Sequence, residues 1–382
     1  MKRLIAFVLL LAAFCTAAMA EERLSWNGEG SDQLVYDCTL PDGRLIFTGN
    51  QGKKGDYTQR KARILCLNPD WSVSWEYMED TKGGCSFGGA QLLRDGRIGV
   101  LFSNSTRNQE NVQEEIRYFT QDGKPTGDPV DIFHPDLLMT NMTPSCIAYA
   151  IIPEDAQTYY HCFMDWEGNM LFRWRSDERM GGGFVLEEVE DGLVFAGYEP
   201  TYPSHAKLMK TDWYGNLIWE TVVPTLLPDG DARLEKMTKL SDGGFAAYLT
   251  EHVFHSSTDS YDFARALARF DQNGRLLWIN QEHVQTPGND TCCDLIEYQG
   301  RIVVAMKENG NFESTKKRMN LWFDLDGNYL GETEQKIQPG ELNIYRRFVI
   351  KENELWALMD IQKGTKFDTN KTDEYLVRVP EL

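Results

Sequence analysis

Histidines gather in the middle of the chain. The segment Glu251-His-Val-Phe-His255 carries two of them, and His205 and His283 lie to either side. Paired imidazoles are zinc ligands, but the zincin motif His-Glu-x-x-His needs a helix that puts both rings on one face. Here the residue order differs, and the segment has the composition of a loop or a strand end. We predict no metal site and take solvated loop histidines as the simpler interpretation; a zinc pair completed by His205 or His283 is the alternative.

Aromatic residues accompany these histidines in segments that are polar otherwise. Rings of this kind stack on sugars or grip a peptide or protein, and they also anchor loops onto a scaffold. Both interpretations stay open. The candidate ligand-binding residues are Tyr198, Tyr202, His205, His252, Phe254, His255, Tyr261 and His283.

Two cysteines are adjacent, at Cys292 and Cys293. Neighbouring cysteines are a candidate vicinal disulfide, and separately buried or differently paired thiols are the alternative. The chain has 8 cysteines in 382 residues, too few for a disulfide-scaffolded domain. Cys38 and Cys66 lie in apolar runs, where a thiol behaves as a small hydrophobic residue.

Carboxylates are abundant, including Asp259, Asp262, Asp290 and Asp294, so an acid pair of the glycosidase type is an alternative that abundance alone makes easy to find. The segment Asp324-Leu-Asp-Gly-Asn328 resembles the start of a calcium loop, but it lacks the later ligands and the distal Glu. No Gly-x-Ser-x-Gly, Walker or dinucleotide motif occurs. The catalytic residues are therefore unknown, no cofactor is expected, and the sequence leans away from an enzyme.

The first 20 residues have the pattern of a signal peptide. Lys2 and Arg3 precede an apolar stretch that is too short to span a bilayer, and Ala18-Met19-Ala20 offers a cleavage site. We expect a secreted or extracytoplasmic protein, with the cell surface as an alternative location, and no transmembrane segment. The formal charge of −19 argues against nucleic acid as a partner.

Short strands and two alternating kinds of turn must position these residues. One kind is a short polar turn, found at Asp42-Gly43, Asp95-Gly96, Glu154-Asp155, Asp191-Gly192, Asp242-Gly243, Gln299-Gly300 and Glu352-Asn353. The other is a phrase such as Arg269-Phe-Asp-Gln-Asn-Gly-Arg-Leu-Leu-Trp278. Repeats of this period predict an all-β, seven-bladed propeller of four-stranded antiparallel blades over residues 21–382.

The units expected are 27–80, 81–135, 136–179, 180–227, 228–285, 286–337 and 338–382. The last unit lacks an outgoing strand, and Arg23-Leu-Ser-Trp26 matches the outgoing phrase Arg275-Leu-Leu-Trp278. We therefore predict that the N-terminal strand completes the C-terminal blade, which removes an exposed sheet edge.

Gly274-Arg-Leu-Leu-Trp278 and Gly215-Asn-Leu-Ile-Trp219 resemble the tryptophan-docking repeats of secreted bacterial propellers of the PQQ type. The resemblance covers the chain after residue 20 and implies a propeller whose Gly-x-x-x-Trp motifs lock neighbouring blades. In PQQ alcohol dehydrogenases an adjacent cysteine pair packs on the cofactor, which Cys292 and Cys293 resemble. This chain is shorter than those enzymes and lacks their calcium-ligand spacing, and two blades have Gly127 and Gly331 where Trp would stand.

A propeller with no recognisable catalytic set is expected to bind rather than react. We predict an acidic, exported, monomeric propeller that binds a glycan, peptide or protein through loops on its funnel face. The alternatives are an extracellular enzyme acting on polysaccharide and an envelope assembly scaffold. Fold alone implies no function.

Overall fold

The computed structural model describes residues 23–26, 31–52, 60–81, 84–105, 112–132, 137–151, 158–181, 184–256, 258–284, 291–307, 318–335, 340–363 and 372–382. The signal peptide expected at residues 1–20 lies outside these residues. Within them the secondary structure is all β, and no helix is long and apolar enough to cross a membrane.

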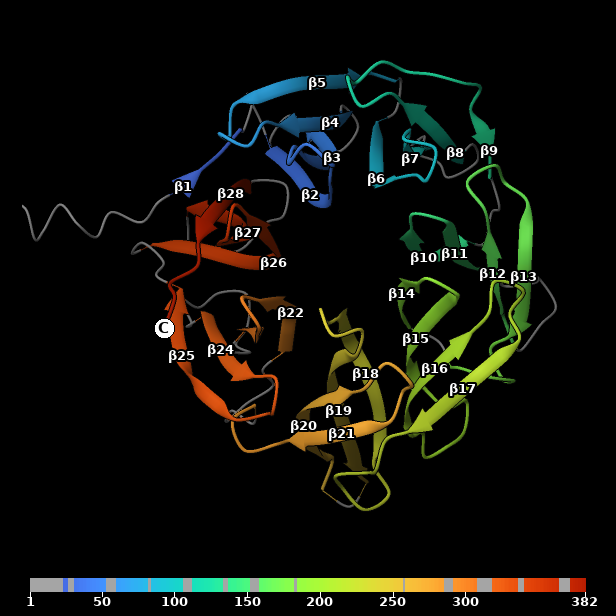
Figure 1. Cartoon of the computed structure of the whole chain (residues 1–382), viewed down its shortest axis with the longest axis vertical. Helices are drawn as coiled ribbons and strands as arrows, with labels where there is room; N and C mark the ends of the chain where they lie inside the picture. The colour runs from blue at the N-terminus through green and yellow to red at the C-terminus, as the bar shows by residue number, and fades with distance from the viewer. Residues whose placement is uncertain are drawn as a thin grey trace, which may run out of the picture.

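Twenty-eight strands in the described residues form seven four-stranded antiparallel sheets arranged in a ring (Figure 1). Six blades use four consecutive strands and the seventh combines the two ends of the chain. From the innermost strand outward, the blades are β2 (Ser31–Thr39), β3 (Leu45–Gly52), β4 (Lys61–Leu67), β5 (Val73–Glu79); β6 (Cys85–Leu92), β7 (Ile98–Ser105), β8 (Val112–Phe119), β9 (Val130–Asp131); β10 (Leu137–Thr143), β11 (Cys146–Ile151), β12 (Tyr160–Met164), β13 (Met170–Arg175); β14 (Val185–Val189), β15 (Gly192–Tyr198), β16 (Ala206–Thr211), β17 (Leu217–Val222); β18 (Asp231–Lys239), β19 (Phe245–His255), β20 (Ser260–Phe270), β21 (Leu276–Asn280); β22 (Thr291–Tyr298), β23 (Arg301–Lys307), β24 (Arg318–Asp324), β25 (Tyr329–Gln335); and β26 (Glu341–Lys351), β27 (Glu354–Lys363), β28 (Asp373–Arg378), β1 (Arg23–Leu24).

Seven blades and their closure through the N-terminal strand are as the sequence predicts. Strand β1 pairs antiparallel with β28, with Arg23 opposite Val377 and Leu24 opposite Leu376. Beyond β1, the Trp26 indole donates a hydrogen bond of 3.1 Å to the Trp71 carbonyl in the first blade. The N-terminal segment therefore joins the seventh blade to the first.

One turn assignment is wrong. Glu154-Asp155 is one of the seven short polar turns expected, one for each blade, but in the third blade the short turn between β10 and β11 is at Pro144 and Ser145. Glu154 and Asp155 instead belong to the connection from β11 to β12, outside the described residues. Pro144 explains the error, since proline fixes the φ that the second position of a tight turn needs without an Asp-Gly pair.

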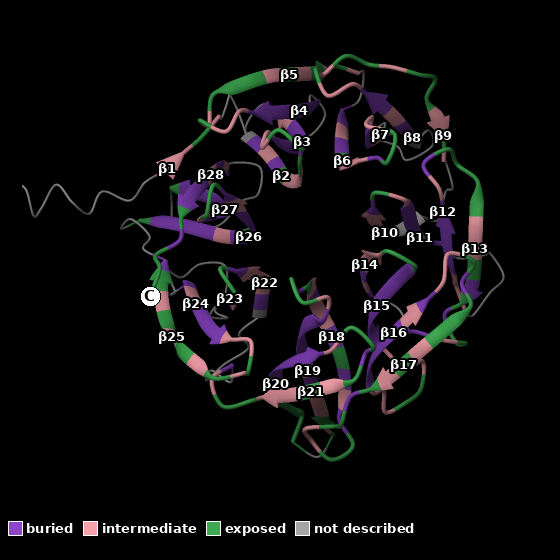
Figure 2. Cartoon of the chain, viewed as in Figure 1, coloured by how far each residue is buried: buried purple, intermediate pink, exposed green. Residues whose placement is uncertain are grey.

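The middle strands of each blade are buried on both faces because each sheet packs between two others. Strand β23 is almost wholly buried along Ile302–Met306, whereas the outer strand β17 is exposed or half-buried throughout. Figure 2 shows this gradient from buried middle strands to the exposed rim. The cores lie between blades: Val194 of the fourth blade packs in one cluster with Phe245 and Phe270 of the fifth.

Glycine–tryptophan contacts connect neighbouring blades at the rim. A Cβ on Gly327 would come within 2.8 Å of the Trp278 indole, whose nitrogen donates to the Leu325 carbonyl at 3.0 Å. Trp219 of the fourth blade covers Gly274 of the fifth in the same way. These contacts are the docking that the Gly-x-x-x-Trp spacing predicts.

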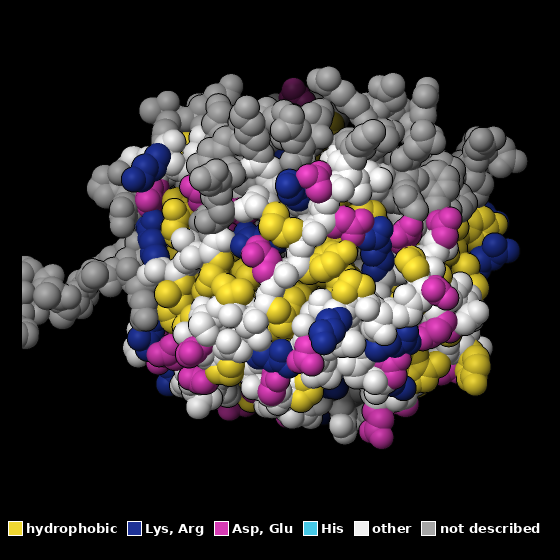
Figure 3. Space-filling view, turned by 90° about the horizontal axis from the view of Figure 1, so that it is seen from above, with side chains coloured by type: hydrophobic (Ala, Val, Ile, Leu, Met, Phe, Trp, Pro, Cys, Tyr) yellow, Lys and Arg dark blue, Asp and Glu magenta, His cyan; other side chains and the backbone are white. Residues whose placement is uncertain are grey.

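On the side of the ring in Figure 3, basic and acidic side chains are interspersed.

Candidate ligand-binding face

Antiparallel strands divide the ring into two faces. The turn face carries the turns that join the first to the second strand and the third to the fourth strand of a blade. The loop face carries the connections from second to third strands and from one blade to the next. All eight candidate ligand-binding residues were expected on the loop face, as its loops vary freely on a rigid scaffold.

The hairpin of β19 and β20 extends the fifth blade on the loop face. Each strand has 11 residues, whereas β3 and β4 have 8 and 7. The sequence interpretation took the segment 251–255 as a loop or a strand end, but strand pairing continues up to His255 opposite Ser260. Alternating aromatic residues favour a strand here, because each second side chain lies on one face.

Four aromatic side chains of this hairpin share one face, which we call the aromatic ladder: His252, Phe254, Tyr261 and Phe263. Phe254 lies opposite Tyr261, with ring centroids 4.8 Å apart, and His252 lies opposite Phe263 at 6.3 Å. Phe254, Tyr261 and Phe263 are 48%, 52% and 46% exposed. Phe263 was missed by sequence reasoning, although its spacing of two from Tyr261 places both rings on the same face of a strand.

His255 belongs to the other face of the hairpin. Its Nε2 lies 2.8 Å from a carboxylate oxygen of Asp262. Glu251, on the same side as His255, accepts hydrogen bonds from the backbone N–H groups of Leu226 and Leu227 at 2.7 and 2.9 Å. This face is therefore tied to the connection that enters the fifth blade, and His255 does not join the aromatic ladder.

Tyr198, Tyr202 and His205 lie at the connection from β15 to β16. Tyr198 lines a pocket of about 290 Å³ whose other walls are Phe184, Val185, Arg233, Leu234 and Glu235. Tyr202 is 87% exposed, and His205 Nδ1 lies 3.1 Å from Glu199 Oε2. The three residues share a loop without forming a single site.

His283 packs between two blades. Its ring stacks on Tyr329 of the sixth blade at a centroid distance of 4.0 Å and an angle of 12°. In the described part of the chain, no group of three or more His, Cys, Asp or Glu residues has the geometry to hold a metal ion.

Cys292 and Cys293 begin the inner strand of the sixth blade, where the pairing with β23 shifts register between Cys292 and Asp294. Cys292 packs in the core between the fifth and sixth blades, and Cys293 against the core between the sixth and seventh. Burial raises the pKa of the Cys292 thiol well above its ordinary value. The vicinal disulfide stays a prediction, which the mass of the unreduced, alkylated protein tests.

Inner strands bring together a charged group that the sequence interpretation did not assemble. Three carboxyls whose pKa is raised by burial also feel the opposing positive charge of Arg347 of the seventh blade: Asp37 of the first blade, Glu187 of the fourth and Asp294 of the sixth. All four residues belong to innermost strands, β26, β2, β14 and β22, which surround the axis of the ring (Figure 1). We call them the central charge group.

Burial outweighs Arg347 in this group and raises the pKa of all three carboxyls, to about 7 for Asp37 and for Glu187. Neighbouring backbone fixes two of the four side chains. Arg347 Nη1 donates to the Tyr36 carbonyl at 3.0 Å, and Asp294 Oδ2 accepts from the Phe348 N–H at 2.6 Å. Of the carboxylates named from the sequence, Asp294 alone belongs to this group.

No protein-family model matches the sequence, and no curated protein matches it. Solved structures do. The chain is similar to the β-propeller domain of the Trilobed protease from Pyrococcus furiosus, with a TM-score of 0.53 and 10% identity over 93% of this chain and 94% of that one. It is also similar to the polysaccharide lyase Uly1, with a TM-score of 0.54 and 8% identity over 93% and 90%.

A third similar structure is an acylaminoacyl peptidase from Pyrococcus horikoshii, with a TM-score of 0.51 and 9% identity. The match covers 92% of this chain and 52% of the peptidase. At these identities the likeness shows the propeller fold alone. The Trilobed protease domain is described as having an open velcro topology, whereas β1 and β28 close the ring here.

Proposed function

We propose that this protein is exported and binds an extracellular glycan, peptide or protein ligand through the aromatic ladder, without catalysis. The observation that carries the proposal is the exposure of three large rings side by side on a hairpin that stands out from the loop face. Each ring offers a large apolar surface, and tyrosine above all is enriched where proteins recognise ligands.

A structural role is the competing account, because cross-strand aromatic pairs also stabilise a hairpin. The two accounts differ in their consequences. If the rings serve the hairpin, removing one lowers stability and leaves binding intact. If they serve a ligand, removing one lowers affinity by about tenfold or more, which is ~1.4 kcal/mol, with a small change in stability.

A glycan and peptide array identifies a ligand, and titration with Phe254→Ala and Tyr261→Ala tests the site. Tyr214→Ala is the matched control, because Tyr214 is 80% exposed in a turn on the turn face. Loss of affinity in both ladder variants, with the control unchanged, supports the proposal. Unchanged affinity in the ladder variants would refute it.

An enzyme acting on polysaccharide is the second candidate, and the central charge group favours it. Carboxyls whose pKa values lie near 7 suit general acid–base catalysis at neutral pH. The test is turnover of any polysaccharide on the array, with loss of turnover in Asp37→Asn and in Glu187→Gln. Turnover that survives both substitutions would remove this group from the chemistry.

A further inference from the structure

The aromatic ladder lies beside an open strand edge. Strand β20 has 11 residues and β21 has 5, and the pairing between them begins only at Leu267 opposite Asn280. From Ser260 to Ala266, β20 therefore pairs with β19 alone among the strands that the structure describes. In the sixth blade, by contrast, β25 pairs with β24 from Arg318 to Phe323, almost the whole length of β24.

The backbone groups of every second residue face this edge. The Asp271 N–H donates to the Arg275 carbonyl at 2.9 Å, so Asp271 directs its backbone groups toward β21. This direction alternates along an antiparallel strand, and β20 pairs with β19 without a register shift between Phe270 and Ser260. The N–H and C=O groups of Tyr261 and Phe263 therefore face outward, beyond the end of β21.

The side chains of the same two residues provide an apolar surface beside the edge. Every residue from Ser260 to Phe263 is exposed, whereas β20 is buried from Ala264 onward. The rings of Tyr261 and Phe263 lie 5.8 Å apart at an angle of 28°. The guanidinium of the buried Arg265 lies 5.9 Å from the centre of the Phe263 ring. Outward backbone groups and stacked rings thus coincide on one short segment.

Other strand edges at the rim carry charge. Strands β5, β13, β17 and β25 each include at least one charged residue, among them Glu76, Arg173, Glu220 and Glu332. Charged side chains on an edge oppose pairing with a further strand. On β20, Tyr261 and Phe263 are uncharged, and Asp262 between them lies on the opposite face, where it contacts His255. The edge of β20 is therefore better suited to receive a strand.

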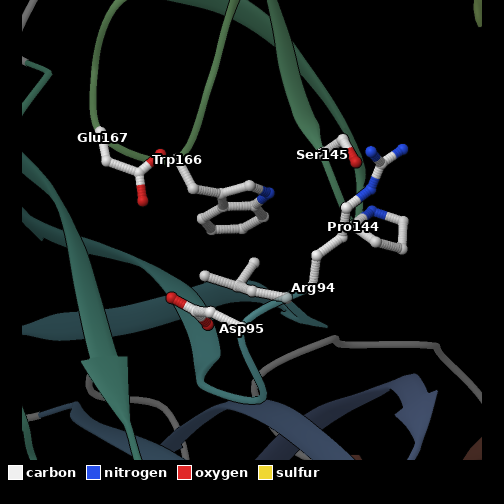
Figure 4. A pocket seen from close by; sticks show the side chains of 7 residues that line it. Arg94, Asp95, Pro144, Ser145, Trp166 and Glu167 are labelled. Atoms are coloured by element: carbon white, nitrogen blue, oxygen red, sulfur yellow. The ribbon is translucent and has the colours of Figure 1, made fainter.

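The pocket of about 250 Å³ on the turn face has no comparable open group. Figure 4 shows Asp95 and Glu167 on one side of Trp166 and Arg94 on the other. Arg94 pairs with Glu188 at 3.0 Å, and Trp166 is 3% exposed. These walls are held by contacts within the protein, whereas the edge of β20 presents both backbone groups and rings.

An open strand edge selects a peptide over a glycan. An added strand pairs its own N–H and C=O groups with those of the edge and places every second side chain on one face of the sheet. A glycan has no such alternation of donors, acceptors and side chains. A second copy of this chain is disfavoured because each copy has a formal charge of −19. The occupant that fits is a different peptide, with an apolar side chain at every second position.

We propose that the exposed edge of β20 binds a peptide in extended conformation as an additional strand, with alternate apolar side chains packed on Tyr261 and Phe263. This inference rests on the proposed function, because it names the class of ligand that the aromatic ladder takes.

Calorimetric titration of the whole protein with acetyl-Lys-Val-Thr-Val-Thr-Val-Lys-amide tests the inference, since its lysines complement the negative charge of the protein. Two further peptides carry N-methyl groups, one on its valines and one on its threonines. In an added strand only one of these two sets of N–H groups faces β20. We therefore expect one methylated peptide to bind about tenfold or more weakly and the other to bind almost unchanged. Absence of saturable binding of the unmethylated peptide at millimolar concentration, or equal effects of the two methylations, would overturn the inference.

Amide hydrogen exchange locates the added strand. The Tyr261 and Phe263 N–H groups are expected to exchange more slowly when the unmethylated peptide is bound, because the peptide then accepts their hydrogen bonds. The amides of the outer strand β17 (Leu217–Val222) are the control and should exchange as before. Unchanged exchange at Tyr261 and Phe263 in the presence of saturating peptide would contradict strand addition.

The outcomes distinguish this inference from the function on which it rests. A glycan whose affinity falls in Phe254→Ala and Tyr261→Ala would support the aromatic ladder as a binding site and refute strand addition. Unchanged affinity of every array ligand in these two variants would refute both.

Discussion

Arg23 and Glu341 lie 318 positions apart in the chain and form a two-pronged ion pair, with N–O distances of 3.0 and 2.9 Å. Their side chains are 13% and 6% exposed. A guanidinium matches a carboxylate with two parallel hydrogen bonds, which makes this the stronger kind of ion pair. The pair joins the two-residue strand β1 to the inner strand of the seventh blade.

Arg23→Ala is expected to lower the free energy of unfolding by ~2–4 kcal/mol, since the buried Glu341 carboxylate would lose both of these charge-assisted hydrogen bonds. Urea denaturation measures the change. Arg175→Ala is the control, because the Arg175–Asp177 pair is 46% and 43% exposed and such pairs contribute less than ~1 kcal/mol. Equal effects of the two substitutions would refute the role given to Arg23.

Gly274→Ala tests the contact between blades at the rim. Gly274 has a φ of +76° and lies under the Trp219 ring, whereas Gly300 has a φ of +70° with no neighbouring atom within 4 Å of an added Cβ. Alanine costs ~1 kcal/mol at either site through its backbone conformation. We expect Gly274→Ala to cost at least twice as much as Gly300→Ala in urea denaturation. Equal costs would mean that the Trp219 side chain moves aside without any loss of stability.

Asp37→Asn tests the central charge group. Burial raises the folded pKa of Asp37 from its ordinary 3.8 to about 7, so its contribution to stability is present below pH 4 and is lost as the pH rises through 7. The amide cannot ionise. We expect Asp37→Asn to raise the free energy of unfolding by ~1–3 kcal/mol at pH 8 and to change it little at pH 4. A gain of equal size at both pH values would contradict this account.

His161 gives the opposite dependence on pH. It is 1% exposed between the rings of Tyr159 and Phe184, and burial lowers its pKa from 6.5 to about 4. The contribution of the neutral His161 side chain to the free energy of unfolding is therefore present above pH 6.5 and is lost as the pH falls through 4. Thermal unfolding of His161→Leu between pH 4 and 7 is expected to depend less steeply on pH than that of the unchanged protein. An unchanged slope in this variant would contradict the account.

Local signals were sufficient for most of the fold. Asp-Gly pairs mark hairpins because glycine accepts positive φ, as at Gly43 and Gly96, and the match between Arg23-Leu-Ser-Trp26 and the outgoing strands identified the closing blade. The turn at Pro144 was missed because it carries a different signal.

The site was less accessible to sequence reasoning. Strand parity puts Phe254 and Tyr261 on one face and His255 on the other, but that parity appears only once residues 250–262 are taken as a hairpin. The central charge group depends on where the inner strands of four blades meet, and no spacing along the chain relates Asp37 to Glu187. A group of residues that meet across the axis of the ring can be recognised only in the structure of the closed ring.

Among the strands that the structure describes, β1 pairs with β28 alone. During synthesis β1 therefore lacks this partner until residues 373–378 have been made. Until then the apolar residues of the first blade that pack against the seventh, among them Leu45 and Phe47, have no neighbouring sheet to cover them.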